Sequence, residues 1–493
     1  MTLRSGGDRS QSSADRVVPI GGAAFEDAYR FEEAHIGSRA AGNSVLPMAT
    51  NRAPDVLEIP GIWSEFSIDA ILRDLIPRIR PEFDPRPIPE NTPREFQRET
   101  GPSRLRQPQP KPQTEISFSR DQLRRNGINP DRVSTTIGVL EPIFAVTAPG
   151  EDHGTLVSGI IEDFIPRAPI QMFRPDSLGS LESFRTRLLS YKNRPNGLDD
   201  FISDTGCSVF NSMSDTLSRL LDSSTTDPAL RVFNMSLGFS RVGLYENIMQ
   251  MFQQHPDKFQ HMIASLIGED KARQWLQQMR SPAPNEGGRN GDAPPSLTAE
   301  LMQAIVAHVD QQLDRNPLFV QAMQRYQEVT RSLANRGIIL VVGASNDGSF
   351  AARWGVKIQA GAEFNFLASS NHVISVGAVN GNGTAGRPKD DFPAAFSSAG
   401  GPLFRPTLLA PGEGVQLGIS TSGTFDGTSC AAPHVSATVA LMLEQNPSLS
   451  FQDVVRLLRQ NSYHLPGVSD YVQGAGVLEM HSAILAARAS RRR

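Results

Sequence analysis

Short apolar runs rich in β-branched residues alternate with longer helical stretches from about residue 130 onward. The clearest of these runs lie at residues 135–140, 230–233, 338–342 and 373–379. Nearly continuous apolar runs of this length are typical of strands buried on both faces of a parallel sheet, with the intervening helices covering it. The pattern predicts an α/β domain with a mostly parallel sheet over residues 131–490.

A longer helical block separates the second of these runs from the third, over residues 239–336. Within it, apolar residues recur every four positions, at Leu301, Ile305, Val309 and Leu313. Gly337 is suited to end the last helix before the next strand, because glycine readily adopts the left-handed conformation found after a helix C-terminus. A stretch rich in proline and glycine at 281–295 predicts a loop inside this helical insertion.

The N-terminal part of the chain has a different pattern. Residues 1–76 contain one helix-like segment, at 68–76, and the following stretch carries ten prolines between positions 77 and 112. Proline fixes φ and removes a backbone donor, so residues 77–130 are predicted to be a Pro-rich linker. Residues 1–76 then form an N-terminal region whose role stays open between a propeptide, a partner-binding region and a targeting region.

Composition and charge exclude several classes of protein. The chain has 493 residues with 39% hydrophobic residues, which is enough for a core and excludes wholesale disorder. Its formal net charge of −4 gives no electrostatic reason to expect nucleic acid as a partner. Two cysteines, Cys207 and Cys430, exclude a disulfide framework and a four-thiolate zinc site.

The start of the chain bears on its location. The first ten residues lack the apolar core of a signal peptide, and the densest apolar run is too short to span a bilayer. We therefore expect no membrane partner and a cytoplasmic location. The Ser- and Arg-rich start leaves export by a specialised secretion system open.

Four segments carry residues suited to nucleophilic catalysis, although each alone is a weak signal. In chain order they are His153-Gly-Thr, Ser236-Leu-Gly238, the turn at Asn346, and Gly427-Thr-Ser429 at the start of an apolar helix. A serine hydroxyl becomes a nucleophile when an imidazole accepts its proton, which assigns Ser429 and His153. The Asn346 amide is a suitable donor to an oxyanion. Each residue also has a structural interpretation, as a helix cap, a buried histidine or a turn residue.

The segment from Gly427 to His434 is similar to the nucleophile signature of the subtilisin-like serine proteases, the subtilase family. The other three segments precede it in the order that this family has, and the resemblance extends over about residues 130–490. It implies a subtilisin-like three-layer domain and a serine endopeptidase that cleaves protein substrates through an acyl-enzyme at Ser429. Pro433 is expected in the first turn of the helix, where its missing N–H is tolerated.

The resemblance also suggests how substrate would bind. The backbone of Ser236, Leu237 and Gly238 is expected to pair with an extended peptide. Small residues at Gly238, Gly343 and Ala344 imply an open pocket for the substrate side chain. No cofactor is expected and no metal site can be nominated. Because family members commonly carry a propeptide, inhibition by the N-terminal region of the same chain is a further expectation.

The acidic member of the site departs from the family's pattern. The family has an aspartate at the end of the first core strand, followed by Ser or Thr and Gly, whereas this chain has Glu141-Pro142. Glutamate can orient an imidazole and stabilise its cation in the same way. Asp152 and Glu151 are the rival acids, and Asp152 is disfavoured because neighbouring side chains usually point apart. A catalytically inactive subtilase-fold binding scaffold and an exported protease effector acting on host proteins remain alternatives.

Two further features have open roles. The helical insertion begins directly after the expected substrate segment, so it is expected to overhang the cleft as a lid, as a docking surface for protein substrates, or as a surface packing insert. Cys430 adjoins Ser429, and it either makes the site sensitive to thiol reagents or packs against the core.

Overall fold

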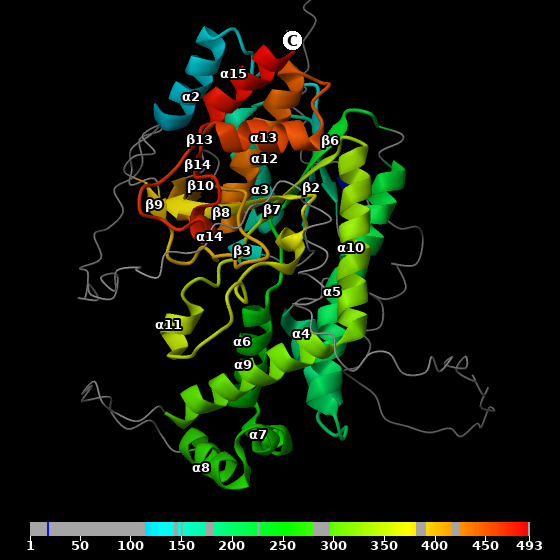
Figure 1. The fold of residues 1–493 in the computed structure, drawn as a ribbon, viewed down its shortest axis with the longest axis vertical. Helices are drawn as coiled ribbons and strands as arrows, with labels where there is room; N and C mark the ends of the chain where they lie inside the picture. The colour runs from blue at the N-terminus through cyan, green and yellow to red at the C-terminus, as the bar shows by residue number, and fades with distance from the viewer. Residues whose placement is uncertain are drawn as a thin grey trace, which may run out of the picture. The chain divides into compact units, whose positions relative to one another are not determined.

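A mostly parallel sheet of ten strands organises the described part of the chain (Figure 1). The computed structural model describes residues 17–18, 114–141, 146–148, 151–173, 181–223, 227–280, 296–380, 391–416 and 424–491. These residues all belong to one compact unit. The helix expected at 68–76, the prolines from 77 to 112 and the loop expected at 281–295 lie outside the described residues.

The central strands of the sheet run parallel, and all of them except the half-buried β5 are largely buried. In spatial order they are β5 (Ile170–Phe173), β2 (Thr136–Leu140), β6 (Leu230–Met235), β7 (Ile339–Gly343), β8 (Ile374–Asn380) and β10 (Leu408–Glu413). The four apolar runs that predicted strands coincide with β2, β6, β7 and β8 to within two residues at each end. The predicted α/β fold with a mostly parallel sheet is confirmed.

Short strands complete the edges of the sheet and form two small hairpins. β1 (Val17–Val18) pairs in parallel with β5, and β14 (Val477–Leu478) does so with β10. β13 (Ser462–Tyr463) and β9 (Phe392–Pro393) add antiparallel pairs to β14 and β8. Two further antiparallel pairs lie apart from the sheet: β3 (Val146–Ala148) with β4 (Glu151–Asp152), and β11 (Val415–Gln416) with β12 (Thr424–Phe425).

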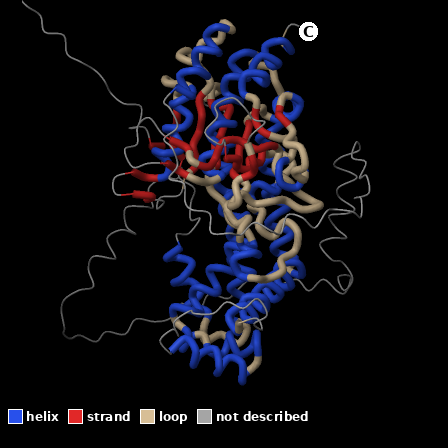
Figure 2. The backbone as a smooth tube through the Cα atoms, turned by 90° about the vertical axis from the view of Figure 1, so that its left-hand side faces the viewer, coloured by secondary structure: helices blue, strands red, loops and turns tan. Residues whose placement is uncertain are grey.

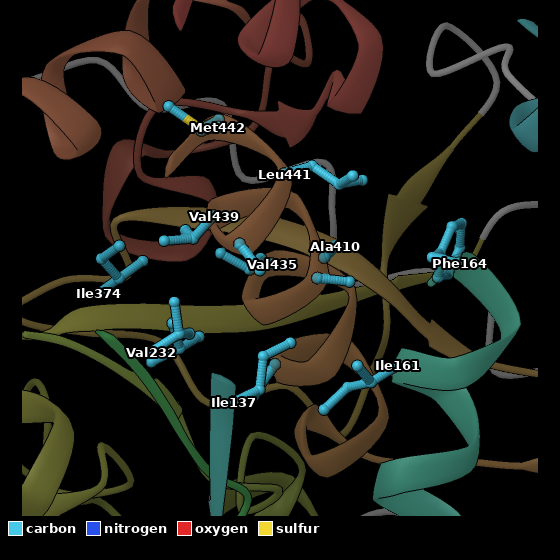
Figure 3. Packing of buried hydrophobic residues seen from close by; sticks show 14 of the residues in the cluster. Ile137, Ile161, Phe164, Val232, Ile374, Ala410, Val435, Val439, Leu441 and Met442 are labelled. Atoms are coloured by element: carbon cyan, nitrogen blue, oxygen red, sulfur yellow. The ribbon is translucent and has the colours of Figure 1, made fainter. Parts of the chain in front are cut away.

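One face of the sheet is covered by helix α12 (Thr428–Gln445). This helix is buried almost all round, as expected of a helix whose surface is apolar on every side. Its side chains join those of β2, β6, β8 and β10 in one hydrophobic core, which Figure 3 shows at Val435, Val439 and Val232. Beside it lie α3 (His153–Phe164), α13 (Phe451–Gln460) and α15 (Met480–Ser490), whose apolar residues belong to the same core.

The other face is covered by two long helices, α5 (Gly197–Ser223) and α10 (Pro317–Asn335), which pack against each other (Figure 1). Alternate residues of a strand point to opposite faces. Val341 of β7 belongs to the core under α12, so Leu340 and Val342 point toward this second helical layer. The domain therefore has the predicted three layers.

Further helices extend this second layer. They are α4 (Leu181–Tyr191), α6 (Arg241–Gln254), α7 (Gln260–Ile267), α8 (Glu269–Arg280), α9 (Leu297–Arg315) and the short α11 (Phe350–Trp354). Figure 2 shows the strands lying together, with a part made only of helices and loops beyond them. The helices of the predicted insertion 239–336 are present, and Gly337 follows α10 with φ of +74°, as expected.

The helices that extend the second layer do not all come from that insertion. α4 and α5 precede β6 in the chain, yet α4 packs on α6, and α5 packs on both α9 and α10. The signal for α5 was present in the sequence, because its buried residues recur at helical spacing: Phe201, Ile202, Val209, Phe210, Met213, Leu217 and Leu220.

Helix α2 (Thr114–Arg125) forms where the sequence predicts the end of a Pro-rich linker. Leu123 of this helix and Ile128 after it are fully buried in the core. The Arg488 guanidinium of α15 donates hydrogen bonds to the carbonyls of Asn126 (2.6 Å) and Gly127 (2.7 Å) just after α2. Packed structure therefore begins before residue 130, because apolar residues follow the last proline of the stretch. None of the described helices is long and apolar enough to cross a bilayer.

Candidate active site

The residues singled out from the sequence follow the carboxyl ends of the central strands. Glu141 comes directly after β2, Ser236 directly after β6, and Asn346 three residues after β7. The carboxyl ends of neighbouring parallel strands lie at one edge of a sheet, which is where α/β folds place their sites. His153 is the first residue of α3, and Ser429 is the second residue of α12.

Glu141 and His153 are in direct contact. Glu141 Oε2 lies 2.8 Å from His153 Nδ1, and the two side chains are only 5% and 19% exposed. The backbone N–H of Glu141 donates to the carbonyl of Phe173 (3.0 Å), which continues the pairing of β2 with β5 and fixes the start of the side chain. The structure thus brings together the acid and the imidazole expected from the sequence. The rivals Asp152 and Glu151 form β4, and their side chains lie outside the described part.

The start of α12 brings Ser429 close to Asn346. The N-cap residue Gly427 has φ of +153°, a conformation that is essentially restricted to glycine. A Cβ atom on Gly427 would lie 2.8 Å from Ser429 Oγ and 3.3 Å from Asn346 Nδ2. The hydroxyl and the amide therefore face the same small space, which glycine leaves open.

The Asn346 amide is oriented by the same helix. Its Oδ1 accepts a hydrogen bond from the backbone N–H of Thr428 (2.8 Å), so Nδ2 is turned toward the space beside Gly427. The preceding residue, Ser345, has φ of +91°, the one positive value among the non-glycine residues that the structure describes. Its hydroxyl donates to Asp347 Oδ2 (2.8 Å), which holds this strained turn in place.

A buried asparagine that the sequence analysis missed connects the two segments expected to bind substrate. Asn365 is 1% exposed, and its Nδ2 donates to the carbonyls of Leu237 (3.1 Å) and Gly343 (2.7 Å). Its backbone N–H donates to the carbonyl of Ala344 (3.0 Å). A single polar residue in a loop has no periodicity, so no sequence signal distinguished it.

The two glycines expected to open a pocket have a different role in the structure. A Cβ on Gly238 would lie 2.0 Å from Asn365 Nδ2, and one on Gly343 would lie 3.0 Å from Thr428 Oγ1. Both positions therefore make room for neighbouring parts of the protein. The position of each missing Cβ is therefore filled by the protein itself, and a substrate pocket beside these residues stays a prediction.

Cys430, next to the nucleophile position, is only 7% exposed. Burial raises the pKa of its thiol to about 12, so it stays protonated near neutral pH. These observations favour the interpretation that Cys430 packs in the core. Among the described residues, no group of three or more His, Cys, Asp or Glu side chains is arranged to hold a metal ion.

Comparison with known proteins places this chain in a family. The model of the subtilase family matches residues 145–476, which is more than half of the chain. The chain belongs to the subtilase family.

Individual relatives share part of their length with this chain. It is 29% identical to a subtilisin of Bacillus pumilus over 157 residues, which is 31% of this chain and 50% of that protein. It is 32% identical to subtilisin DY of Bacillus licheniformis over 159 residues, 32% of this chain and 50% of that protein. The chain thus spans about half the length of these relatives. Among solved structures, MycP1 from the ESX-1 type VII secretion system is similar with a TM-score of 0.40 and 16% identity, covering 75% of this chain and 85% of that one.

Proposed function

We propose that this protein is a serine endopeptidase that cleaves protein substrates through an acyl-enzyme at Ser429. The observation that carries the proposal is the 2.8 Å contact between Glu141 Oε2 and His153 Nδ1. A buried carboxylate in this position holds one imidazole tautomer, with the proton on Nδ1, and leaves Nε2 as the base. It also stabilises the imidazolium that forms when the base accepts a proton.

The proposed reaction uses the remaining residues in turn. Ser429 Oγ attacks the carbonyl carbon of the scissile peptide bond while His153 Nε2 accepts the hydroxyl proton. The resulting oxyanion is stabilised by Asn346 Nδ2 and by the positive end of the α12 dipole. The C–N bond then breaks as the imidazolium returns its proton to the leaving amine. Water, deprotonated by the same imidazole, hydrolyses the ester and restores Ser429.

We propose that substrate binds in extended form along Ser236–Gly238. These residues follow β6 outside its strand pairing, and an extended segment of this kind can pair with a peptide backbone in a sequence-tolerant way. Asn365 supports this role, because it holds the segment at a fixed separation from Gly343 and Ala344.

Helix α6 begins near the edge of the sheet where the candidate active site lies. Ser240, the N-cap of α6, donates from Oγ to Asp347 Oδ2 (2.6 Å), one residue after Asn346. We propose that α6 and the helices packed on it border the substrate groove and contribute to docking of protein substrates. The alternative of an inactive binding scaffold rested on the unusual Glu141-Pro142. The contact of Glu141 with His153 supports the enzyme instead.

Hydrolysis of unfolded casein tests the proposal. The full chain is compared with Ser429→Ala and with Ser332→Ala, a matched serine replacement at an exposed position on α10. Cleavage that is retained in Ser332→Ala and lost in Ser429→Ala is expected. Equal cleavage by all three proteins would mean that a contaminating protease is responsible and would contradict the proposal.

Inhibition by the N-terminal region is proposed as the form of regulation. The intact chain is followed over time by mass spectrometry and by its activity. If residues before α2 inhibit the site, wild-type protein should lose them as its activity rises, whereas Ser429→Ala should remain intact. Activity that starts at its maximum in uncleaved protein would exclude this regulation.

A further inference from the structure

Helix α12 lacks one of its backbone hydrogen bonds at the nucleophile. Pro433 is the sixth residue of this helix, not part of its first turn as the sequence suggested. In an α-helix the N–H of each residue bonds to the carbonyl four positions earlier, which for residue 433 is the carbonyl of Ser429. Proline has no N–H, so the carbonyl of the proposed nucleophile has no helical donor.

A side chain from the sheet supplies the missing donor. Ser236 Oγ donates a hydrogen bond to the Ser429 carbonyl oxygen at 2.9 Å. Ser236 is only 8% exposed, so its hydroxyl is held in a nearly closed environment. This bond joins the residue that follows β6 to the first turn of α12, a helix that packs on this strand.

The Ser236 hydroxyl is itself oriented by a buried chain of hydrogen bonds. Asn234 Nδ2 donates to Ser236 Oγ (2.8 Å). The one proton of the Ser436 hydroxyl is shared between Asn234 Oδ1 (2.9 Å) and the carbonyl of Ala432 (3.1 Å). Asn234 and Ser436 are both fully buried. Since Asn234 occupies one acceptor site of the Ser236 oxygen, the single proton of that hydroxyl is directed to Ser429. These hydrogen bonds connect the middle of α12 with β6 and return to the start of the same helix.

We infer that Ser236, oriented by Asn234 and Ser436, is a positioning residue for the nucleophile. This inference rests on the proposed function of Ser429. The hydroxyl replaces the hydrogen bond that Pro433 removes and so fixes the first turn of α12 relative to β6. It also links the nucleophile to the segment expected to bind substrate. Small displacements of a reacting group are costly, since a shift of about 1 Å can lower a rate about 10²-fold.

The test is a double-mutant cycle in the full chain, read out as kcat, KM and the rate of labelling by a fluorophosphonate. Ser236→Ala removes the donor and is expected to lower kcat and the labelling rate about 10- to 100-fold, with KM changed by less than about threefold. Pro433→Ala restores a backbone N–H four residues after Ser429. In that background, Ser236→Ala should cost less than about threefold, because the helix again supplies the donor.

Two further variants guard against loss of folding and nonspecific effects. Ser436→Ala removes the hydroxyl at the far end of these hydrogen bonds. Ser436 lies about 10 Å along the helix from Ser429 and is fully buried, so it does not contact substrate. It should lower kcat severalfold without raising KM. Thr438→Val is the matched control, because Thr438 is also buried on α12 and bonds to the carbonyl four residues earlier, at His434 (2.8 Å), outside the chain. It should label at the wild-type rate.

The outcomes separate this inference from the proposed function. Rescue of Ser236→Ala by Pro433→Ala supports the positioning role. Equal losses in both backgrounds, or a loss confined to KM, would overturn it while leaving Ser429 as the nucleophile. Wild-type protein that does not label at all would overturn the proposed function and the positioning role together.

Discussion

The helices on the two faces of the sheet are held by different interactions. Under α12 the contacts are almost entirely apolar, and the few buried polar groups, such as Asn234 and Ser436, bond to one another. The helices of the other layer rely on buried charge as well. Arg241 of α6 pairs with Asp310 and Asp314 of α9, and Tyr245 donates to Asp310. The layer that carries the nucleophile is therefore specified by packing, and the other layer also by ion pairs.

This difference separates the layer that carries the proposed nucleophile and base from the layer that carries buried ion pairs. Ser429 and His153 both lie in the first turn of a helix of the apolar layer. The charged cluster at Arg241 lies between α6 and α9, so its loss should unfold or loosen these helices with a smaller effect on the reaction. Four substitutions or treatments test this distinction, beginning with the largest effect.

Glu141→Gln should have the largest effect on catalysis. The amide keeps the size of the side chain but cannot hold the His153 tautomer or stabilise its cation, so kcat is expected to fall about 10⁴-fold. Peptide hydrolysis measures this loss, and thermal unfolding should show little change. Retention of kcat within tenfold of wild type would move the role of the acid to another residue, Asp152 first.

Arg241→Ala should have the largest effect on stability. Its side chain is 13% exposed and pairs with Asp310, which is 17% exposed, so its removal leaves a largely buried carboxylate uncompensated and should cost about 3–5 kcal/mol. Arg273→Ala is the control, because its pair with Asp270 is exposed and worth less than about 1 kcal/mol. Urea unfolding compares the two. Similar losses in both variants would contradict the importance of buried charge here.

The loss of unfolding free energy in Arg241→Ala should also depend on pH. Burial raises the pKa of the Asp310 carboxyl, and the nearby Arg241 guanidinium opposes this rise. Without the guanidinium, the pKa in the folded state should rise further above the unfolded value. The folded protein then binds the proton more tightly, so stability is lost as pH rises through the folded pKa. Urea unfolding at acidic pH should therefore show a smaller loss of unfolding free energy in Arg241→Ala than urea unfolding at neutral pH.

Gly427→Ala tests the space between Ser429 and Asn346. The added methyl would lie 2.8 Å from Ser429 Oγ, where the oxyanion is proposed to form, and kcat should fall about 10²-fold or more. Gly355→Ala is the matched control, because that glycine also has a positive φ, of +65°, but has no atom within 4 Å of the added Cβ. Its kcat should be close to wild type. Equal losses in the two variants would attribute the effect to backbone strain alone.

Treatment with iodoacetamide should have the smallest effect. The buried Cys430 thiol, with its pKa raised to about 12, is almost wholly protonated at pH 8 and should resist alkylation. The same thiol should react readily after unfolding in guanidinium chloride, which peptide mapping would detect. Rapid alkylation of native Cys430 would contradict its placement in the apolar layer.

The apolar layer was also the part that sequence analysis predicted best. The strands β2, β6, β7 and β8 are nearly continuous apolar runs, a pattern typical of strands buried on both faces. The contact of Glu141 with His153 could be predicted because Glu141 lies at the end of the first core strand, where the subtilase family has its aspartate. Pro433 was placed in the first turn because the helix start was expected too close to it.

Other features depended on contacts between distant segments. The amide of Asn365 joins residues more than a hundred positions away to the end of β7, and nothing in its neighbourhood distinguishes it from an ordinary loop residue. Gly238 and Gly343 were interpreted as space for substrate because sequence does not reveal which side chain fills the position of a missing Cβ. Ion pairs such as Arg241 with Asp310 connect separate amphipathic helices, whose partners periodicity does not specify.

Labelling by a fluorophosphonate tests the central claim most directly. The probe forms a covalent bond only with an activated serine, and peptide mapping locates the adduct. The account predicts one adduct, on Ser429, which is lost in Ser429→Ala, greatly slowed in His153→Ala and Glu141→Ala, and unchanged in Ser332→Ala. Labelling at another serine, or labelling of Ser429 that does not depend on His153, would contradict the account.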